Sequence, residues 1–579
     1  MLKTRWGVCF VVLFLLCGVA CDSNFGEGAG EDGGTTPSES GFCAEMNLSP
    51  EPFQSGKGGY LFGDLAEDFR VKEVGGIEWS LREEWTGCDS YIFFSYFQFS
   101  GASGQSYMDG LWSISFKELI DASAKNVHYF FISSEIAEAE RLSRMEELRG
   151  RFLRELNNEF ADDHQVRAHW VQRFHFVSDR LTMVHGSVGG FVGDYLNYKD
   201  TASPVDLGDR GEAPAPYPFS FAIGRDQRWD ATGSLSEYVG GPESLRMVAY
   251  NSAFYNHRAE LRARLAAETD TRVLPLMEES VTARVLLKDV TFPEASELME
   301  VDTLEFDVAV TCPHRNPFGC SEWDRIARIS LCTEFEPADA ESCVESTEVV
   351  RWITPYWRRG RRRWVMDASP FVALIQAGGV QRFRVEMGPS WERGTERHAA
   401  MSVRLSNKKV GYKSQSVLRA FSGGSFNADY NKAREPFRFT PPANAKRVEL
   451  VTIVSGHGQT ESDGCAEWCN HVHKFRVNAA ESSVHEISYT DIRNPTGCAE
   501  RANEGVMPGQ WGNWSQSRAG WCPGLPVETL RMDISDEVTL GAENSLTYEG
   551  SFRGGEPKGG DITMNAYVVW YVPCPGGKC

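Results

Sequence analysis

Hydrophobic and polar positions follow two different patterns along this chain, and the change falls at about residue 272. Before it, continuous apolar runs at 91–97 and 127–132 are followed by charged segments such as 135–158, where apolar residues return every three or four positions. Such runs indicate buried strands, and such spacing indicates amphipathic helices. The order strand, helix, strand, helix, strand predicts an α/β region with some parallel pairing over residues 43–271.

After residue 272 the pattern alternates with a period of two. Segments 304–310, 401–405 and 448–454 alternate apolar and polar residues between turns rich in Gly, Pro and Asn. This alternation is typical of antiparallel strands that turn one face to a core. We therefore predict two jelly-roll β-sandwich domains, residues 272–410 and 411–579, and a chain that is mainly β.

The first 42 residues show neither pattern. A short charged start leads into the apolar run 6–20, which has the length of a signal peptide and is too short for a typical spanning helix. Small residues then precede Cys21, as in a bacterial lipobox, although Gly18 stands where Leu is usual. We expect residues 1–20 to be a lipoprotein-type signal peptide and Cys21 to carry the lipid. An ordinary secretory signal with a chance cysteine is the alternative.

Residues 21–42 are rich in Gly and acidic side chains and predict a flexible tether. The expected product is an exported bacterial lipoprotein, periplasmic or at the cell surface, that meets the membrane only through its lipid anchor. Across all 579 residues, 59 Lys and Arg face 80 Asp and Glu, a net charge of −21. This acidic balance argues against a nucleic-acid partner, since phosphate backbones need clustered cations.

The chain has fifteen cysteines. Cys9 and Cys17 fall in the signal segment and Cys21 is the lipid site, which leaves an even number. Export and the close sequence spacing of most of them predict up to six disulfides, one of them between Cys43 and Cys88. A zinc site of Cys465, Cys469, His471 and His473 is the alternative, and export favours disulfides over it. The remaining cysteines are Cys312, Cys320, Cys332, Cys343, Cys498, Cys522, Cys574 and Cys579.

Three segments, 312–325, 455–469 and 512–524, are dense in Trp, Cys and charged residues. Each presents one carboxylate or one Arg beside a Trp. Indole rings stack on sugar faces, and carboxylates activate water or protonate a leaving group. Asp324 and Glu467 belong to different β regions and can meet only where these regions join. An isolated Glu-Trp pair more often marks a structural acid bonded to arginine or to backbone.

Four motifs in order carry a resemblance to a known family: 320–325, 353–357, 464–469 and 518–524. They resemble the peptide:N-glycosidase F family over residues 272–579. The resemblance implies two side-by-side, eight-stranded antiparallel jelly rolls. It also implies an amidase that hydrolyses the Asn–GlcNAc amide of N-glycoproteins or N-glycopeptides, releases the glycan and leaves Asp, without metal or cofactor. The α/β region would be an additional N-terminal domain, and we expect a monomer.

By position, Asp324 matches the family's primary catalytic acid, and Glu467 matches a second carboxylate that assists through a water. Four residues match substrate-side positions: Arg325, Trp391, Arg518 and Trp521. The resemblance also implies the disulfides Cys312–Cys320, Cys465–Cys469 and Cys498–Cys522, with Cys332–Cys343 as an extra one on an insertion.

The match has departures close to the expected sugar site. Pro389 stands where the family has a third acid, two residues before Trp391. His457 replaces a Trp, and Gln459 replaces a His. These changes affect the expected glycan preference and activity.

Two other functions fit parts of the pattern. A glycan-binding surface lipoprotein without turnover would keep the Trp and Arg residues and tolerate the loss of the third acid. A copper monooxygenase would also use two jelly rolls, with His471 and His473 as a pair, but His314 and His398 are scattered in the first β region. The simplest interpretation of the pair is two surface histidines on one strand. The basic run 358–363 predicts a solvated turn, with contact to acidic glycans as its alternative use.

Overall fold

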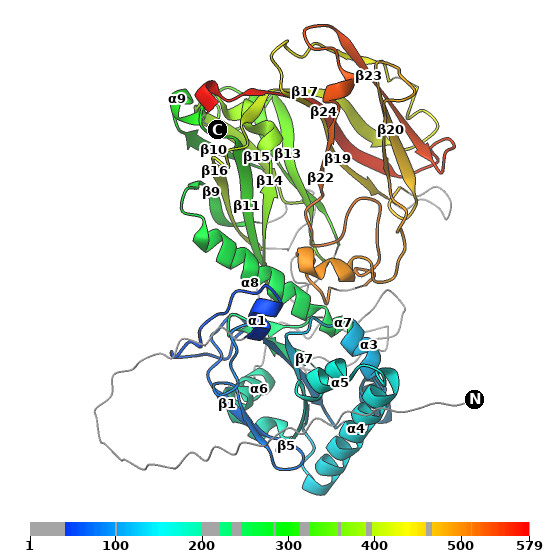
Figure 1. The fold of residues 1–579 in the computed structure, drawn as a ribbon. Helices are drawn as coiled ribbons and strands as arrows, with labels where there is room; N and C mark the ends of the chain where they lie inside the picture. The colour runs from blue at the N-terminus through cyan, green and yellow to red at the C-terminus, as the bar shows by residue number, and fades with distance from the viewer. Residues whose placement is uncertain are drawn as a thin grey trace, which may run out of the picture.

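A computed structural model describes residues 41–98, 101–197, 220–233, 245–281, 285–312, 323–356, 360–388, 397–432, 434–458, 466–510, 512–577 and 579. The predicted signal segment, Cys21 and all but the last two residues of the predicted tether lie outside these ranges. Two β-sandwiches stand side by side, and an α/β region lies beneath them (Figure 1). The mainly β architecture predicted from the alternation is confirmed.

The α/β region is built on a five-stranded sheet in the order β5-β4-β3-β7-β8. Its first three strands pair in parallel, as the strand-helix order predicted, and the last two pair antiparallel. The strands are β3 (Ser90–Tyr96), β4 (Val127–Ser133), β5 (Phe174–Arg180), β7 (Ser220–Ile223) and β8 (Trp229–Ala231). The helices between them include α2 (Ala102–Trp112), α3 (Phe116–Asp121), α4 (Glu138–Glu159), α5 (His164–Val171) and α6 (Ser187–Asn197).

Aromatic residues fill both faces of this sheet, which explains the continuous apolar runs. Phe131 meets Phe116 of α3, while the next residue back, Phe130, faces the other way and meets Phe69 and Trp79. The latter two belong to a small sheet of β2 (Glu78–Ser80), β1 (Phe69–Lys72) and β6 (His185–Gly186). A strand covered on both faces has no polar side to show.

The first sandwich packs the sheet β10-β15-β12-β13 on the sheet β14-β11-β16-β9, with antiparallel pairing throughout. Alternation is clear in β14, where Arg362, Trp364 and Met366 are buried and their neighbours are more exposed. The strands are β9 (Arg272–Val281), β10 (Val285–Phe292), β11 (Thr303–Cys312), β12 (Ile326–Glu334), β13 (Glu345–Ile353), β14 (Gly360–Asp367), β15 (Gly379–Glu386) and β16 (Arg397–Ser406).

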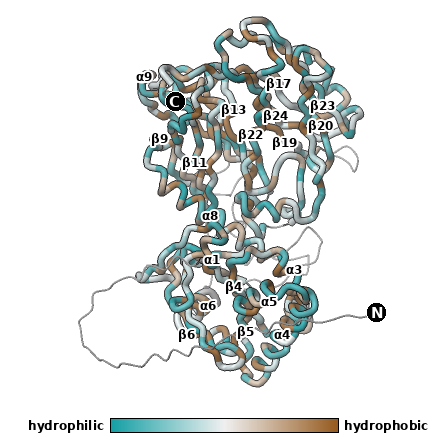
Figure 2. The backbone as a smooth tube through the Cα atoms, in the orientation of Figure 1, coloured by the Kyte–Doolittle hydropathy of each residue, from teal (hydrophilic) through white to brown (hydrophobic). Residues whose placement is uncertain are grey.

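The second sandwich packs β17-β24-β19-β22 on β18-β23-β20-β21, again antiparallel. Each sandwich therefore has eight strands in the described residues, as predicted. The strands are β17 (Tyr412–Ser425), β18 (Phe437–Phe439), β19 (Arg447–His457), β20 (His471–Val477), β21 (Val484–Ser488), β22 (Thr529–Asp533), β23 (Asn544–Phe552) and β24 (Asp561–Pro573). Figure 2 shows hydrophobic residues concentrated in the strands and hydrophilic residues along the outer helix α4.

Two predictions about polar runs were wrong. The basic run is no simple turn, because its last four residues, 360–363, open strand β14. His471 and His473 are not surface residues but fully buried in β20. Their rings bond to each other (Nδ1···Nε2 2.6 Å), and His473 Nδ1 contacts the Tyr548 hydroxyl at 2.7 Å. The alternating pattern was ambiguous because it fixes which side chains share a face, and not which face is buried.

Four disulfides join the pairs expected from the cysteine spacing or the resemblance: Cys43–Cys88, Cys332–Cys343, Cys498–Cys522 and Cys574–Cys579. Cys469 is also disulfide-bonded. Cys320, Cys465 and the side chain of Cys312 lie outside the described parts. Within the described residues, no helix has the length and apolar character needed to cross a membrane, and no three His, Cys, Asp or Glu residues group as metal ligands.

The three bodies meet around one segment of the second β region, residues 498–525. Helix α8 (Asn251–Ala267), preceded by α7 (Arg246–Ala249), lies between the α/β region and the sandwiches, with η3 (Ala499–Glu504) beside it (Figure 1). One apolar cluster includes Phe254 of α8, Trp514 of this segment and Tyr356 from the end of the first sandwich. Tyr356 therefore belongs to an apolar cluster to which all three bodies contribute.

Candidate active site

The predicted acids lie at the seam of the two sandwiches. Asp324 lies two residues before the start of β12 in the first sandwich, and Glu467 lies in the bend before β20 of the second. Tyr356 follows β13, and Arg518 lies on the loop between η3 and β22. Each acid therefore lies close to the end of a strand, where the sheet fixes the backbone and a loop side chain can take part in binding or catalysis.

A chain of three hydrogen bonds connects the acids. Arg518 Nε donates to Glu467 Oε1 at 3.3 Å, and Arg518 Nη2 donates to the Tyr356 hydroxyl at 3.3 Å. The Tyr356 hydroxyl then donates to Asp324 Oδ2 at 2.8 Å. Asp324 and Glu467 thus approach each other where the two β regions join, as expected. The side chains of Tyr356 and Arg518 lie between them.

Arg518 is held rigidly at the centre of this chain. Its side chain is fully buried, and it donates to Asn513 Oδ1 and to the Gln516 carbonyl, both at 2.9 Å. The guanidinium lies 4.5 Å from the ring centre of Trp468 and 4.8 Å from that of Trp521. A guanidinium confined between indole faces keeps its charge and loses its freedom to turn.

Both carboxyl groups have raised pKa values. Burial and the nearby charge of Asp324 raise the pKa of Glu467 to about 7, against the opposing effect of Arg518. Burial also raises the pKa of Asp324, while Arg518 and the Tyr356 hydroxyl act to lower it. At neutral pH Glu467 therefore holds a proton for about half of the time. A protonated acid beside a second carboxyl group is an arrangement suited to general acid-base chemistry.

Tyr356 itself stays protonated, because burial and the Asp324 charge both raise its pKa. Its hydroxyl is therefore a permanent donor to Asp324. Tyr356 lies in the motif 353–357, but the sequence predicted no role for it. The sequence showed Tyr356 only as one residue of a motif, since its contact with Asp324 joins residues that are 32 positions apart.

The other predicted residues have different surroundings. Arg325 is fixed by its backbone, which exchanges hydrogen bonds with Thr354 (both 2.8 Å) and so secures the position of the adjacent Asp324. Trp521 is only 3% exposed, and its ring N–H donates to the Gly456 carbonyl at 2.7 Å. Its ring lies against the Arg518 guanidinium, and its role toward a substrate stays a prediction. Trp391 lies outside the described residues.

His457, which stands where the family has Trp, packs on Trp521 with ring centres 5.0 Å apart. Burial and nearby cations lower the pKa of His457 to about 3, so the ring is neutral. Arg351 donates to Ser455 Oγ at 2.9 Å, and this hydroxyl lies 2.7 Å from His457 Nε2. The Ser455 hydroxyl therefore joins Arg351 to the His457 ring.

Trp323 is a surface candidate that sequence reasoning did not single out. It is 53% exposed and immediately precedes Asp324. Among the large apolar side chains it is the exposed one nearest to the acids in sequence. An exposed indole beside a carboxyl pair is suited to stacking on a sugar.

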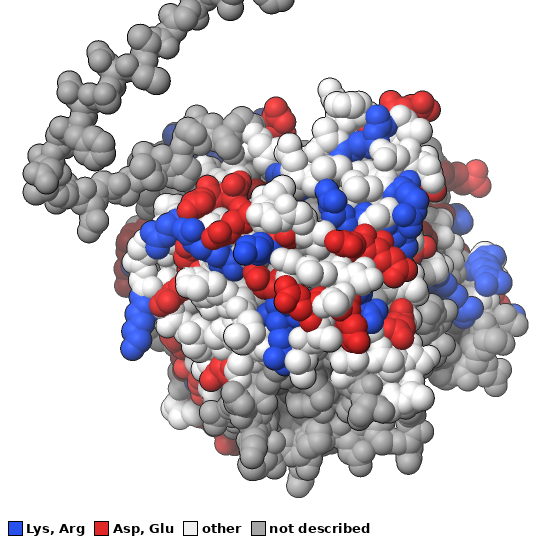
Figure 3. Space-filling model, turned by 90° about the horizontal axis from the view of Figure 1, so that it is seen from below, with Lys and Arg blue, Asp and Glu red and all other residues white. Residues whose placement is uncertain are grey.

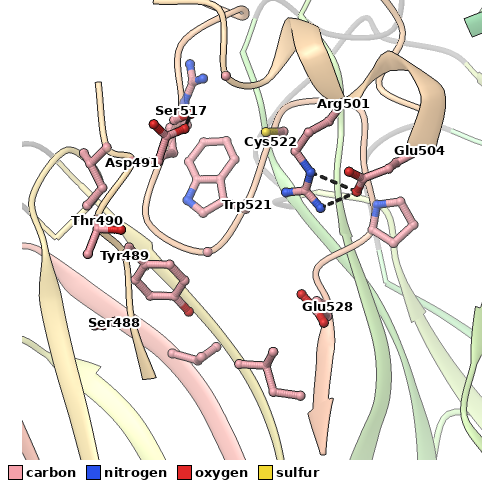
Figure 4. Close-up of a pocket in the computed structure, with 17 residues that line it drawn as sticks. Ser488, Tyr489, Thr490, Asp491, Arg501, Glu504, Ser517, Trp521, Cys522 and Glu528 are labelled. Atoms are coloured by element: carbon pink, nitrogen blue, oxygen red, sulfur yellow. Dashed lines mark hydrogen bonds and ion pairs between the residues drawn. The ribbon is translucent and has the colours of Figure 1, made fainter. Parts of the chain in front are cut away.

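The loop that carries Arg518 and Trp521 also borders a cavity of about 510 Å³. Figure 4 shows Trp521 and Tyr489 facing it, with Asp491 and Glu528 at its rim. Arg501 and Glu504 form an ion pair at 2.8 Å on its far side. The site thus has a hollow beside it that is lined by aromatic and acidic residues.

Paired acidic groups held through a buried arginine at the seam of two jelly-roll sandwiches define a class of protein with an acid-base centre between its β domains. Residues 425–569 match the model of the family described as Peptide-N-glycosidase F, C terminal. Over 272 residues the chain is 26% identical to peptide-N(4)-(N-acetyl-beta-D-glucosaminyl)asparagine amidase F of Elizabethkingia miricola, covering 45% of this chain and 70% of that protein.

Two solved structures are similar as well. PNGase F, a glycosylasparaginase from Flavobacterium meningosepticum, aligns at 22% identity with a TM-score of 0.38, over 52% of this chain and 96% of that one. PNGF-II aligns at 12% identity with a TM-score of 0.38, over 55% of this chain and 68% of that one. The chain is therefore similar to the peptide-N-glycosidase F family, and the resemblance that its four motifs carry is confirmed.

Proposed function

We propose that this protein is an amidase that hydrolyses the amide between Asn and the first GlcNAc of N-glycoproteins or N-glycopeptides. The proposal rests on the series of hydrogen bonds that connects Asp324 with Glu467 through Tyr356 and Arg518. This series joins one acid from each sandwich. The amidase of Elizabethkingia miricola, whose name describes this reaction, is the relative that supports the choice of substrate.

In the proposed reaction, the Asp324 carboxylate takes a proton from a water molecule. The water oxygen attacks the amide carbonyl carbon, and the carbon–nitrogen bond breaks. The nitrogen leaves with a proton supplied from protonated Glu467 through a water, so the products are an Asp side chain and a glycosylamine. Tyr356 keeps Asp324 oriented, and Arg518 compensates the charge that develops on the acids.

The test compares wild type with Asp324→Asn on a denatured N-glycoprotein. Asn keeps the shape of the side chain and removes the carboxylate. We expect wild type to release the glycan and the variant to lose at least about a hundredfold in rate, within the usual contribution of a general base. Near-wild-type release by Asp324→Asn would refute the mechanism.

The second candidate is a glycan-binding protein without turnover, which the exposed Trp323 beside the acids favours. It predicts that wild type binds the glycopeptide and releases no sugar. The copper alternative loses its main residues, because His471 and His473 are bonded to each other and to Tyr548 inside the core.

We also propose that the chain is exported as a lipoprotein through Cys21 and acts as a monomer. Support comes from the apolar run 6–20 and the small residues before Cys21. Cys21→Ser should move the protein from the membrane fraction to the soluble fraction. An unchanged distribution would favour an ordinary secretory signal.

A further inference from the structure

A second cavity lies between the α/β region and the first sandwich, and the reaction proposed above does not use it. Its volume is about 620 Å³. Its walls come from the turn and strand at 226–231, from α8, and from the adjoining ends of β11 and β14. We call it the arginine pocket, because Arg228, Arg258, Arg262, Arg361 and Arg363 all line it.

Three of these arginines are neutralised within the protein. Arg258 pairs with Asp226 at 3.2 Å and also with Asp230. Arg262 pairs with Asp226 at 3.2 Å and with Glu51 at 2.6 Å. Arg363 donates from Nε to Asp307 Oδ1 at 2.7 Å. These pairs fix the shape of the pocket wall.

Arg228 and Arg361 are different. Both are exposed, and neither forms an ion pair with a carboxylate in the part of the chain that the structure describes. Arg228 donates only to the Gly63 carbonyl, at 2.8 Å. They approach the pocket from opposite bodies, one from the α/β region and one from the first sandwich. Two guanidinium groups that line one hollow and have no carboxylate ion pair within the described residues suit an anion, since a guanidinium can bind a carboxylate or phosphate with two parallel bonds.

The arginine pocket gathers five arginines, in contrast to the mixed charges on the face seen from the α/β end. Figure 3 shows positive and negative side chains interspersed over the face seen from the α/β end. The whole chain carries a net charge of −21. Arg228 and Arg361 therefore place positive charge in a hollow of a protein whose net charge is negative, and such a hollow attracts anions that an acidic surface repels.

The pocket also lies within reach of the acids. Arg361 pairs in register with Thr311, and Gly360 pairs with Cys312 at the end of β11. Gly360 comes four residues after Tyr356, so their Cα atoms are no more than roughly 15 Å apart. A substrate whose amide lies at Asp324 needs only a few peptide residues or sugar units to span this distance.

We propose that the arginine pocket binds an acidic group, a carboxylate or phosphate, carried by the substrate a few units from the amide that is cleaved. This inference rests on the proposed function for the identity of the substrate. It assigns the α/β region a part in substrate selection, through Arg228. Arg361, a residue of the basic run 358–363 that lies in β14, would then contact the acidic group of the substrate.

The test measures Kd in an Asp324→Asn background, so that binding is read without turnover. The double variant Arg228→Ser/Arg361→Ser is compared with Arg476→Ser, which removes an exposed arginine of β20 that lines neither cavity. Two pairs of glycopeptides are used: one peptide with a sialylated or a desialylated glycan, and one neutral glycan with acidic or neutral flanking residues. Each pair gives a ratio of Kd for the neutral form to Kd for the acidic form.

We expect this ratio to fall about three- to tenfold in the double variant for one of the pairs, and the effect to shrink as salt is added. The pair that responds identifies whether the acidic group belongs to the glycan or to the peptide. Ratios that match those of Arg476→Ser for both pairs would overturn the proposal. Failure of the amidase itself appears separately, as absent hydrolysis of every glycopeptide by protein with Asp324 intact.

Discussion

At the scale of single residues, Arg518 organises the site. It contacts Glu467 directly and reaches Asp324 through Tyr356, so one buried cation serves acids from two sandwiches. A buried charge of this kind is costly unless it is fully bonded, and here its nitrogens are bonded to four partners. These bonds hold Arg518 between the two acids.

Glu467 should make the free energy of unfolding depend on pH. Its pKa rises from 4.5 to about 7 on folding, so the folded state holds the proton more tightly than the unfolded chain. This contribution is complete below pH 4.5 and is lost as the pH rises through 7. Relative to Glu467→Gln, we expect the free energy of unfolding of wild type to fall by roughly 1–3 kcal/mol between pH 4.5 and 7.

Denaturant unfolding across this pH range measures the difference. Glu556→Gln, at an exposed carboxyl group of the second sandwich, is the matched control and should run parallel to wild type. A wild-type curve that stays parallel to Glu467→Gln would contradict the raised pKa.

Tyr356→Phe tests the bond to Asp324. The hydroxyl stabilises the ionised carboxylate, so its removal should raise the pKa of Asp324. We expect kcat/KM to fall about tenfold and the acid limb of its pH profile to move up by about half a pH unit or more. Tyr489→Phe, a tyrosine at the neighbouring cavity, is the control. An acid limb at the same pH in Tyr356→Phe and wild type would contradict the effect of Tyr356 on the pKa of Asp324.

At the scale of elements, the site depends on where strands end and on what ties those ends together. Gln510 is a positioning residue of this kind and is fully buried. Its Oε1 accepts from the Tyr356 backbone N–H at 3.0 Å, and its Nε2 donates to the carbonyls of Met507 (3.0 Å) and Pro523 (2.7 Å). One amide thus joins the end of β13 to both sides of the loop that carries Arg518.

Gln510→Leu keeps the side-chain volume and leaves three buried backbone groups without this partner. We expect the free energy of unfolding to fall by about 2–4 kcal/mol. The acid limb of kcat/KM should also move in the direction seen for Tyr356→Phe, which a loss of stability alone would not cause. Gln376→Leu, at a residue of the first sandwich that bonds Ser414, should lower stability and leave the limb in place. Equal limbs in both variants would contradict the positioning role.

Element by element, much of the fold was predictable from local pattern. The aromatic runs of β3 and β4 and the alternation of β11 and β16 identified their strands, because burial on two faces or on one leaves a direct trace in sequence. Asp324 and Glu467 were found from their motifs. What the pattern could not give were contacts between distant segments: Tyr356 on Asp324, the burial of His471, and the enclosure of Trp521 against Arg518.

At the scale of the whole molecule, the α/β region is more than an attachment. Its helix α8 and its turn at 232–233 lie against the segment 498–525, and Tyr356 shares the apolar cluster that extends from it. Glu268, at the end of α8, pairs with Arg404 of the first sandwich. We infer that docking of the α/β region helps to hold the site in shape.

Gly233→Ala tests this docking. Gly233 has φ +86°, and an added Cβ would lie 2.2 Å from the Gly509 carbonyl oxygen, so backbone must move. Gly75→Ala is a matched control, since Gly75 has φ +101° with open space around it and suffers only the backbone strain of about 1 kcal/mol. We expect Gly233→Ala to lower Tm and kcat/KM clearly more than Gly75→Ala. Equal effects of the two variants would show that the contact does not matter.

The central claim is hydrolysis of the glycosylasparagine amide by water, and isotope labelling tests it most directly. The protein is incubated with an N-glycopeptide in water enriched in oxygen-18, and the peptide product is analysed by mass spectrometry. We predict a peptide free of sugar, with Asp in place of Asn and one oxygen-18 atom in that side chain. A peptide that keeps its Asn and one GlcNAc, or a glycopeptide that is bound and returned intact, would contradict it.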